Sequence, residues 1–153
     1  MEDSRKFLTD CMLGRLARCL RILGYDTAYA GHLNDSRILA WARYEGRILL
    51  TRDHLLAKRA GALAILVEEE KINKQLSEID KKTGLTKRAW FSRCPVCNQA
   101  LELTTSADSR PYIPLYVYRG FSEVKRCPSC QRIFWKGTHW VRFRNSLLTL
   151  LDT

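Results

Sequence analysis

The chain has 153 residues, enough for one ordinary core of about 90 residues and a small second module. Its formal net charge is +10, with 17 Lys or Arg against 12 Asp or Glu in residues 1–89 and 9 against 4 in residues 90–153. No apolar run reaches membrane-spanning length, and no basic amphipathic helix stands apart from the core pattern. We therefore expect a nucleic acid partner and no membrane. Charge alone leaves open a surface that only confers solubility.

Short apolar runs alternate with helical patterns over the first 89 residues. The runs cover Lys6–Thr9, Thr27–Ala30, Arg47–Thr51 and Ala62–Val67, and the helical patterns cover Met12–Leu23, Asp35–Glu45, Asp53–Ala60 and Lys71–Thr83. Each helical pattern is followed by a glycine, which suits a left-handed C-cap. This alternation predicts an α/β domain built on a parallel sheet.

Aspartates follow three of these expected strands. Asp10 comes directly after the first, Asp35 starts the helix after the second, and Asp53 closes the third. The carboxyl ends of parallel strands meet at one edge, where ligands bind. Three carboxylates in a basic chain predict a Mg²⁺ or Mn²⁺ site suited to phosphodiester hydrolysis. Alternatively, each aspartate only caps a helix.

Four cysteines form two Cys-Pro-x-Cys turns separated by 29 residues: Cys94, Cys97, Cys127 and Cys130. Four thiolates fill the tetrahedral shell of a structural zinc ion. His139 is an alternative ligand, and disulfide pairing is an alternative to the metal. The absence of a signal peptide favours a reducing, cytoplasmic compartment, in which Cys11 and Cys19 are expected to be buried thiols.

The second module is expected at residues 90–153. Strand-like runs at Ala100–Leu103, Leu115–Tyr118 and Ile133–Trp135 predict a small antiparallel zinc ribbon, and Trp140–Leu151 predicts a short helix. The composition turns basic and aromatic over Thr86–Ser92, which indicates the junction with the α/β domain of residues 1–89.

Several segments, in order, resemble the Mut-seven C-terminal ribonuclease domain, a zinc-ribbon-bearing branch of the PIN-like nucleases. They are Phe7–Arg18 (FLTDCMLGRLAR), Leu23–Asp26 (LGYD), Gly46–Asp53 (GRILLTRD), Arg93–Asn98 (RCPVCN), Cys127–Cys130 (CPSC) and Trp135–Trp140 (WKGTHW). The resemblance implies a PIN-like three-layer α/β sandwich and a divalent-metal ribonuclease. It also implies an acidic site at Asp10, Asp35 and Asp53. Many PIN nucleases use four acids, and Glu68, Glu69 or Glu70 is the open alternative for the fourth.

Basic residues near both expected sites are candidates for RNA binding. Arg15, Arg18 and Arg52 lie near the expected carboxylate edge, where guanidinium groups suit phosphates. In the second module, Trp135 and Trp140 interleave with three more candidates, Lys136, Arg142 and Arg144. That pattern suits base stacking on single-stranded RNA, although the tryptophans could instead fill the ribbon core.

Together these features predict a metal-dependent ribonuclease whose ribbon helps to hold RNA. A non-catalytic protein that binds RNA or the ribosome is the main alternative. A zinc-ribbon adaptor for protein partners is a third hypothesis, and it predicts binding that depends little on salt.

Overall fold

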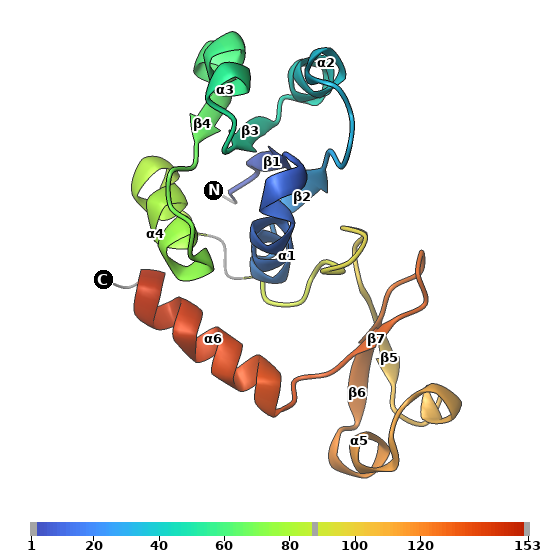
Figure 1. Cartoon of the computed structure of the whole chain (residues 1–153). Coiled ribbons are helices and arrows are strands. Elements are labelled where there is room, and N and C mark those ends of the chain that lie inside the picture. The colour runs from blue at the N-terminus through green and yellow to red at the C-terminus, as the bar shows by residue number, and fades with distance from the viewer. Residues whose placement is uncertain (1–2, 87–88, 152–153) are drawn as a thin grey trace.

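A four-stranded parallel sheet forms the centre of the first part of the molecule (Figure 1). The computed structural model describes residues 3–86 and 89–151. The strands are β1 (Lys6–Thr9), β2 (Asp26–Tyr29), β3 (Ile48–Thr51) and β4 (Ala64–Leu66), in the spatial order β2-β1-β3-β4. All four strands expected from the sequence are present, with ends shifted by no more than two residues. The prediction of a parallel α/β sheet is confirmed.

Helices cover both faces of this sheet, because neighbouring strand residues point to opposite sides. Phe7 and Leu50 belong to one buried apolar cluster, and Leu8 and Leu49 belong to the other. The first cluster includes residues of α1 (Gly14–Leu23) and α4 (Ile72–Thr83), and the second includes residues of α2 (Asp35–Glu45) and α3 (His54–Ala60). The sheet is therefore the middle of three layers.

The C-terminal helix also contributes to the first cluster. Helix α6 (Thr138–Leu151) returns from the ribbon and packs against α4 (Figure 1). Leu147 is buried in the same cluster as Leu16, Leu20 and Leu76. Residues from the end of the chain thus complete the core of the α/β part. None of the described helices is long and apolar enough to cross a membrane.

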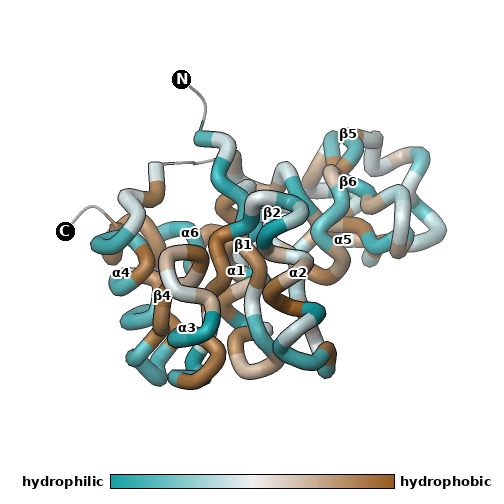
Figure 2. The backbone as a smooth tube through the Cα atoms, turned by 90° about the horizontal axis from the view of Figure 1, so that it is seen from above, coloured by the Kyte–Doolittle hydropathy of each residue, from teal (hydrophilic) through white to brown (hydrophobic). Residues whose placement is uncertain are grey.

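The ribbon is a three-stranded antiparallel sheet in the order β5-β6-β7. Its strands are β5 (Glu102–Thr105), β6 (Glu123–Arg126) and β7 (Ile133–Phe134). Figure 2 shows β5 and β6 as largely hydrophilic, in contrast to the hydrophobic β1 and β4. A small antiparallel sheet beside the cysteine turns was expected, and it is present.

The middle ribbon strand lies elsewhere than the sequence predicted. Leu115–Tyr118 was expected to be a strand but lies in helix α5 (Leu115–Gly120). The N–H groups of Val117 and Tyr118 donate to the carbonyl of Pro114 in the first turn of this helix. The aromatic and β-branched run favours a strand, but Pro114 starts a helical turn that buries Val117. The true strand β6 buries only Val124, so it lacks a visible apolar pattern.

One expectation for the two remaining cysteines is also wrong. Cys19 is buried in α1, and burial raises the pKa of its thiol to about 11. Cys11 is exposed, because it lies in the 3-10 turn Cys11–Leu13 between β1 and α1, where only Leu13 is buried.

Candidate functional site

The four cysteines of the two turns converge on one point. Their sulfur atoms all lie within 4.8 Å of one another, and the Sγ–Sγ distances are 3.7 Å for Cys94–Cys130 and 3.2 Å for Cys97–Cys127. A zinc tetrahedron with Zn–S bonds of about 2.3 Å has sulfurs about 3.8 Å apart. A disulfide needs about 2.05 Å, and the thiols are free. His139 is not part of this cluster.

The two cysteine turns have the same local backbone. The N–H of Asn98 donates to the carbonyl of Cys94 at 2.9 Å, and the N–H of Gln131 donates to that of Cys127 at 3.0 Å. Asn98 and Gln131 both adopt a left-handed conformation, with φ of 69° and 63°. This conformation closes each turn so that its two sulfurs face the same side. Both turns are therefore pre-shaped for metal binding.

The chemistry of this cluster suits a soft divalent metal. Burial raises the pKa of the Cys94 thiol, while the backbone N–H of Arg132 lowers the pKa of the Cys130 thiol. A cation is needed to hold a buried sulfur such as Cys94 as a thiolate. Four sulfur ligands select zinc or an iron–sulfur centre over a hard cation. The residues present fit a structural zinc ion.

The first turn is attached to the α/β domain by buried polar groups. The Arg21 guanidinium donates to the carbonyls of Thr27 (2.8 Å), Pro95 (3.0 Å) and Val96 (3.1 Å). The Asn98 amide accepts from the Thr27 N–H at 3.0 Å and donates to Asp26 at 2.7 Å. These contacts were not predictable from the sequence, because no spacing links residues about 70 positions apart.

Two aspartates meet at the carboxyl edge of the parallel sheet. Asp10, which follows β1, is 5% exposed, and its Oδ2 accepts from the Thr51 hydroxyl at 2.6 Å and the Arg52 N–H at 3.0 Å. The Thr51 hydroxyl oxygen in turn accepts from the Asp53 N–H at 3.0 Å. Thr51, the last residue of β3, therefore connects the two aspartates. Its role was not apparent from the sequence.

Both aspartates also cap helical turns. Asp10 Oδ1 accepts from the Met12 N–H at 2.9 Å, and Asp53 Oδ1 accepts from the N–H groups of Leu55 (2.8 Å) and Leu56 (3.1 Å). The capping alternative is thus correct for these two residues, but capping uses only part of each carboxylate. Within the described residues, Asp53 Oδ2 accepts no hydrogen bond and remains open to solvent or a ligand.

Asp35 sits at the first position of α2, where Asn34 and not Asp35 caps the helix. Its Oδ2 lies 3.3 Å from Arg59 Nη1 of α3, in an exposed ion pair. Among the described residues, only the four cysteines form a group of three or more potential ligands with all donor atoms within 4.8 Å. The donor atoms of the three aspartates therefore do not all come within 4.8 Å of one another, in contrast to the four sulfurs.

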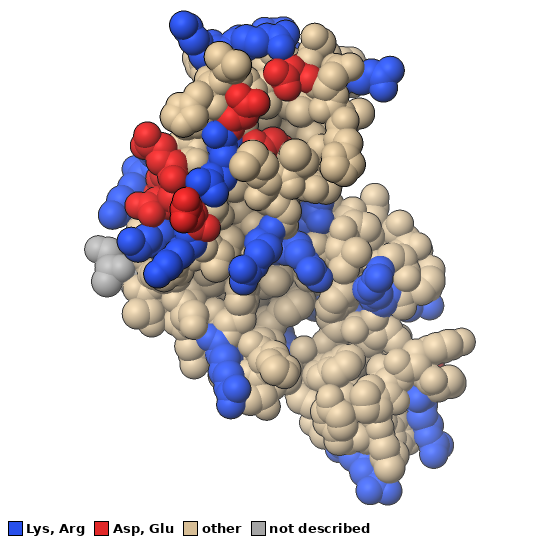
Figure 3. All heavy atoms as spheres, in the orientation of Figure 1, with Lys and Arg blue, Asp and Glu red and all other residues tan. Residues whose placement is uncertain are grey.

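The glutamates after β4 form a further acidic patch. Glu70 lies 4.0 Å from Arg52, whereas the backbone N–H groups of Glu68 and Glu69 donate to the Glu78 carboxylate. Figure 3 shows acidic side chains gathered over the start of α4 and between α2 and α3, with basic side chains beside them. Of the three glutamates, Glu70 contacts a residue next to Asp53.

The arginines of α1 line a basic groove beside the first cysteine turn. This groove of about 610 Å³ is lined by Arg15, Arg18 and Arg132 together with Pro95 and Val96. Arg15 and Arg18 are exposed, and no ion pair holds either of them within the described part of the chain. In Figure 3, Lys and Arg side chains lie between the acidic patch and the ribbon. The groove therefore carries an excess of positive charge.

The three basic candidates near the C-terminus differ in their surroundings. Lys136 Nζ lies 5.2 Å and Arg144 Cζ lies 5.7 Å from the ring centroid of Trp140. Arg142 is exposed on α6. Trp140 itself packs edge-on against Trp90, with ring centroids 6.3 Å apart. Trp140 therefore packs against Trp90 and also has the cationic groups of Lys136 and Arg144 over its ring.

Comparison with known proteins places the chain in a nuclease family. The family described as "Mut7-C RNAse domain" matches residues 5–147. The human protein "Exonuclease mut-7 homolog" is 37% identical in an alignment 111 residues long, which covers 67% of this chain but only 13% of that protein. No solved structure matches the chain. Because the match extends over nearly all described residues, including the aspartate edge and all four cysteines, the chain belongs to the Mut7-C RNAse domain family.

Proposed function

We propose that the chain is a divalent-metal-dependent ribonuclease that hydrolyses RNA phosphodiester bonds at the carboxyl edge of a PIN-like domain. The observation that carries this proposal is the Asp10–Thr51–Asp53 connection, which ties the Asp10 carboxylate and the Asp53 backbone N–H to that edge in a member of an RNase domain family. In this proposal residues 1–89 cleave RNA, and residues 90–153 bind structural zinc and RNA. The cytoplasm is the proposed compartment.

The donor atoms at the edge fit a hard cation. Asp53 Oδ2 is open, and Asp10 Oδ1 accepts one described hydrogen bond, so each retains lone pairs. Mg²⁺ usually binds one or two carboxylates and keeps several waters. Asp35 can therefore act on the ion through a bound water without binding it directly. Mg²⁺ or Mn²⁺ bound there would polarise a phosphoryl oxygen and lower the pKa of a bound water.

The protein's own groups have distinct roles in this proposal. The hydrogen bonds of Asp10 hold its buried carboxylate in one orientation, and the exposed Asp53 is placed to meet the substrate. Arg15 and Arg18 neutralise phosphates beside the cleaved bond, with Arg52 in the same role closer to Asp53. Arg59 orients the Asp35 carboxylate through their ion pair.

The variant Asp53→Asn tests the site, because Asn caps a helix about as well as Asp but lacks the charge that binds a hard cation. Cleavage of labelled RNAs with Mn²⁺ or Mg²⁺ should fall by more than about 100-fold, since losing even an indirect partner of a metal costs about 10- to 100-fold. The thermal stabilisation that Mn²⁺ gives the wild type should also largely disappear.

Asp80→Asn is the matched control, because Asp80 also accepts a backbone N–H, from Leu85 at 2.8 Å, but lies at the end of α4. It should keep full cleavage and the full Mn²⁺ shift. An unaltered Mn²⁺ shift in Asp53→Asn would exclude the metal site. RNA binding without divalent-dependent cleavage in the wild type would instead support the non-catalytic alternative.

A further inference from the structure

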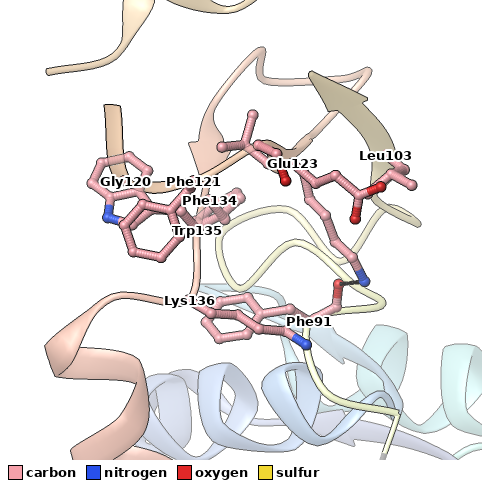
Figure 4. Close-up of a pocket in the computed structure, with 11 residues that line it drawn as sticks. Phe91, Leu103, Gly120, Phe121, Glu123, Phe134, Trp135 and Lys136 are labelled. Carbon is pink, nitrogen blue, oxygen red and sulfur yellow. Dashed lines mark hydrogen bonds between the residues drawn. The ribbon is translucent and has the colours of Figure 1, made fainter. Parts of the chain in front are cut away.

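Two adjoining pockets lie where the ribbon meets helix α6. The larger has a volume of about 720 Å³, and the smaller, drawn in Figure 4, has about 330 Å³. Four aromatic residues line both pockets: Phe91, Phe121, Phe134 and Trp135. Ligand pockets commonly have volumes of about 300 to 1,000 Å³. The pair is therefore large enough for flat aromatic groups to enter.

The aromatic walls come from segments far apart in the sequence. Phe91 comes from the linker before the first cysteine turn, Phe121 follows α5, and Phe134 and Trp135 come from the end of β7. The rings of Phe91 and Phe134 lie 6.2 Å apart with an interplanar angle of 36°. Tyr116, at the wall of the larger pocket, is 66% exposed. These rings are only partly covered by protein.

The charge around the pockets is positive. Lys136 and Arg144 are held over the ring of Trp140, a wall residue of the larger pocket. Lys125, at the smaller pocket, donates to the Phe91 carbonyl at 2.8 Å (Figure 4). Among the described residues no acidic one lines the larger pocket, and Glu123 is the one acidic residue in the wall of the smaller pocket, which also contains Lys125 and Lys136. A polyanion with flat apolar groups matches this combination better than an apolar peptide does.

One polar group in the wall has no partner. The indole N–H of Trp140 is buried and, within the described residues, is the only buried side-chain nitrogen or oxygen without a hydrogen bond. Buried polar groups are normally paired. This N–H is covered by protein, so it marks an unpaired donor close to the pocket and not a contact that a base reaches directly.

A third groove joins the pockets to the basic residues of α1. It has a volume of about 620 Å³ and shares Phe91, Phe134 and Phe143 with the larger pocket. It is also lined by Arg15 and Arg18 of α1, the helix that follows the turn capped by Asp10. A strand held in the aromatic pockets could therefore follow this groove toward the carboxylate edge.

We propose that the two pockets hold unpaired bases of a single RNA strand by stacking, with the adjoining phosphates over Lys136 and Arg144. The ribbon then selects single-stranded over double-stranded RNA, because only unpaired bases can enter. This inference rests on the proposed ribonuclease function for its substrate class. Its test, however, measures binding alone.

The experiment compares binding of a single-stranded RNA of about 12 nucleotides, an abasic strand of equal length and a duplex, without added Mg²⁺ or Mn²⁺. Tyr116→Ala and Trp135→Ala should each weaken single-strand binding by about five- to 150-fold, because stacking contributes to that degree per base. Binding of the abasic strand should be weaker than that of RNA in the wild type, and it should change little in either variant.

Tyr112→Ala is the matched control, since Tyr112 is also an exposed ribbon tyrosine, at 78%, but lines neither pocket. It should bind like the wild type, and zinc content confirms that each variant is folded. Equal affinity for RNA and the abasic strand, or equal affinities of Tyr116→Ala and Tyr112→Ala, would overturn the inference. Base-dependent binding without any cleavage would retain the pockets and reject the ribonuclease proposal.

Discussion

The α/β part and the ribbon have different sources of stability. The α/β part buries two apolar clusters, one on each face of its sheet. Among the described ribbon residues, the buried apolar set is small: Cys94, Pro95, Val117, Val124 and Cys127. Two of these are cysteines of the metal cluster. A module with so little buried surface usually depends on a staple, and the four clustered cysteines are placed to provide one by holding a metal ion.

The two cysteine turns show how the parts are joined. Both have the same backbone hydrogen bond and a left-handed residue at the matching position, but within the described part of the chain only the first turn is hydrogen-bonded to Arg21 and Thr27. In the second turn, the Gln131 side chain donates only to its own neighbour, the Pro128 carbonyl, at 2.8 Å. Identical local structure thus supports two roles, because one turn also serves as the attachment to the α/β part.

The largest expected effect is the loss of zinc. Cys127→Ser should abolish zinc binding, whose apparent free energy in small zinc modules is about 10–16 kcal/mol, and the ribbon should unfold. Hydrogen exchange should show lost protection in β5 to β7 but retained protection in β1 to β4 and α6. Cys11→Ser, an exposed cysteine outside the cluster, should keep full zinc content. Full zinc content in Cys127→Ser would refute the four-thiolate site.

The second-largest expected effect tests whether α6 contributes to the stability of the α/β part. Leu147→Ala should lower the free energy of unfolding by about 2–5 kcal/mol, because it leaves a cavity beside Leu16 and Leu76. Denaturant melts measure this change. Val141→Ala, on the same helix but 43% exposed, should cost less than about 0.5 kcal/mol. If both variants behaved alike, residues 1–89 would be stable without α6.

A smaller effect should separate the two cysteine turns. Asn98→Gly keeps the left-handed backbone but removes two side-chain hydrogen bonds, each contributing about 0.5–1.5 kcal/mol. The Thr27 amide should then exchange hydrogen faster. Gln131→Gly makes the same change in the second turn and should leave Thr27 exchange unaltered. Equal effects of the two variants would show that the first turn is not the attachment.

The smallest effect concerns the pH dependence of this attachment. Burial opposes ionisation of Asp26, but hydrogen bonds from Arg47 and Asn98 outweigh it, so the pKa of Asp26 is lowered in the folded protein. A lowered pKa stabilises the fold above the unfolded value of about 3.9, and this stability is lost as the pH falls through the folded pKa.

Urea unfolding midpoints between neutral pH and pH 3 measure this contribution. Asp26→Asn should show a shallower loss of stability below about pH 4 than the wild type. Asn98→Gly removes one of the two donors and should show part of the same change. Identical pH profiles of the wild type and Asp26→Asn would mean that the Arg47 and Asn98 contacts do not favour the ionised carboxylate.

The sequence by itself determined the features that depend on neighbours along the chain. Apolar runs such as Lys6–Thr9 and the glycines after the helices specify the parallel α/β order, because strand and helix periodicities are local properties. The Cys-Pro-x-Cys spacing specifies the two cysteine turns for the same reason. The position of Asp10 and Asp53 at one edge followed from strand order, and their capping roles were also foreseen.

Only the tertiary structure decided which distant groups meet. The sequence of residues 115–126 did not reveal strand β6. Val124 is the one buried residue of this strand, so its sequence lacks the alternation of apolar and polar residues that identifies a strand. Arg21 and Asn98 contact residues more than 70 positions away along the chain. Asp35 pairs with Arg59, which is 24 positions away, and α6 returns to pack against α4. Such contacts depend on the packing of whole elements, and no local periodicity encodes them.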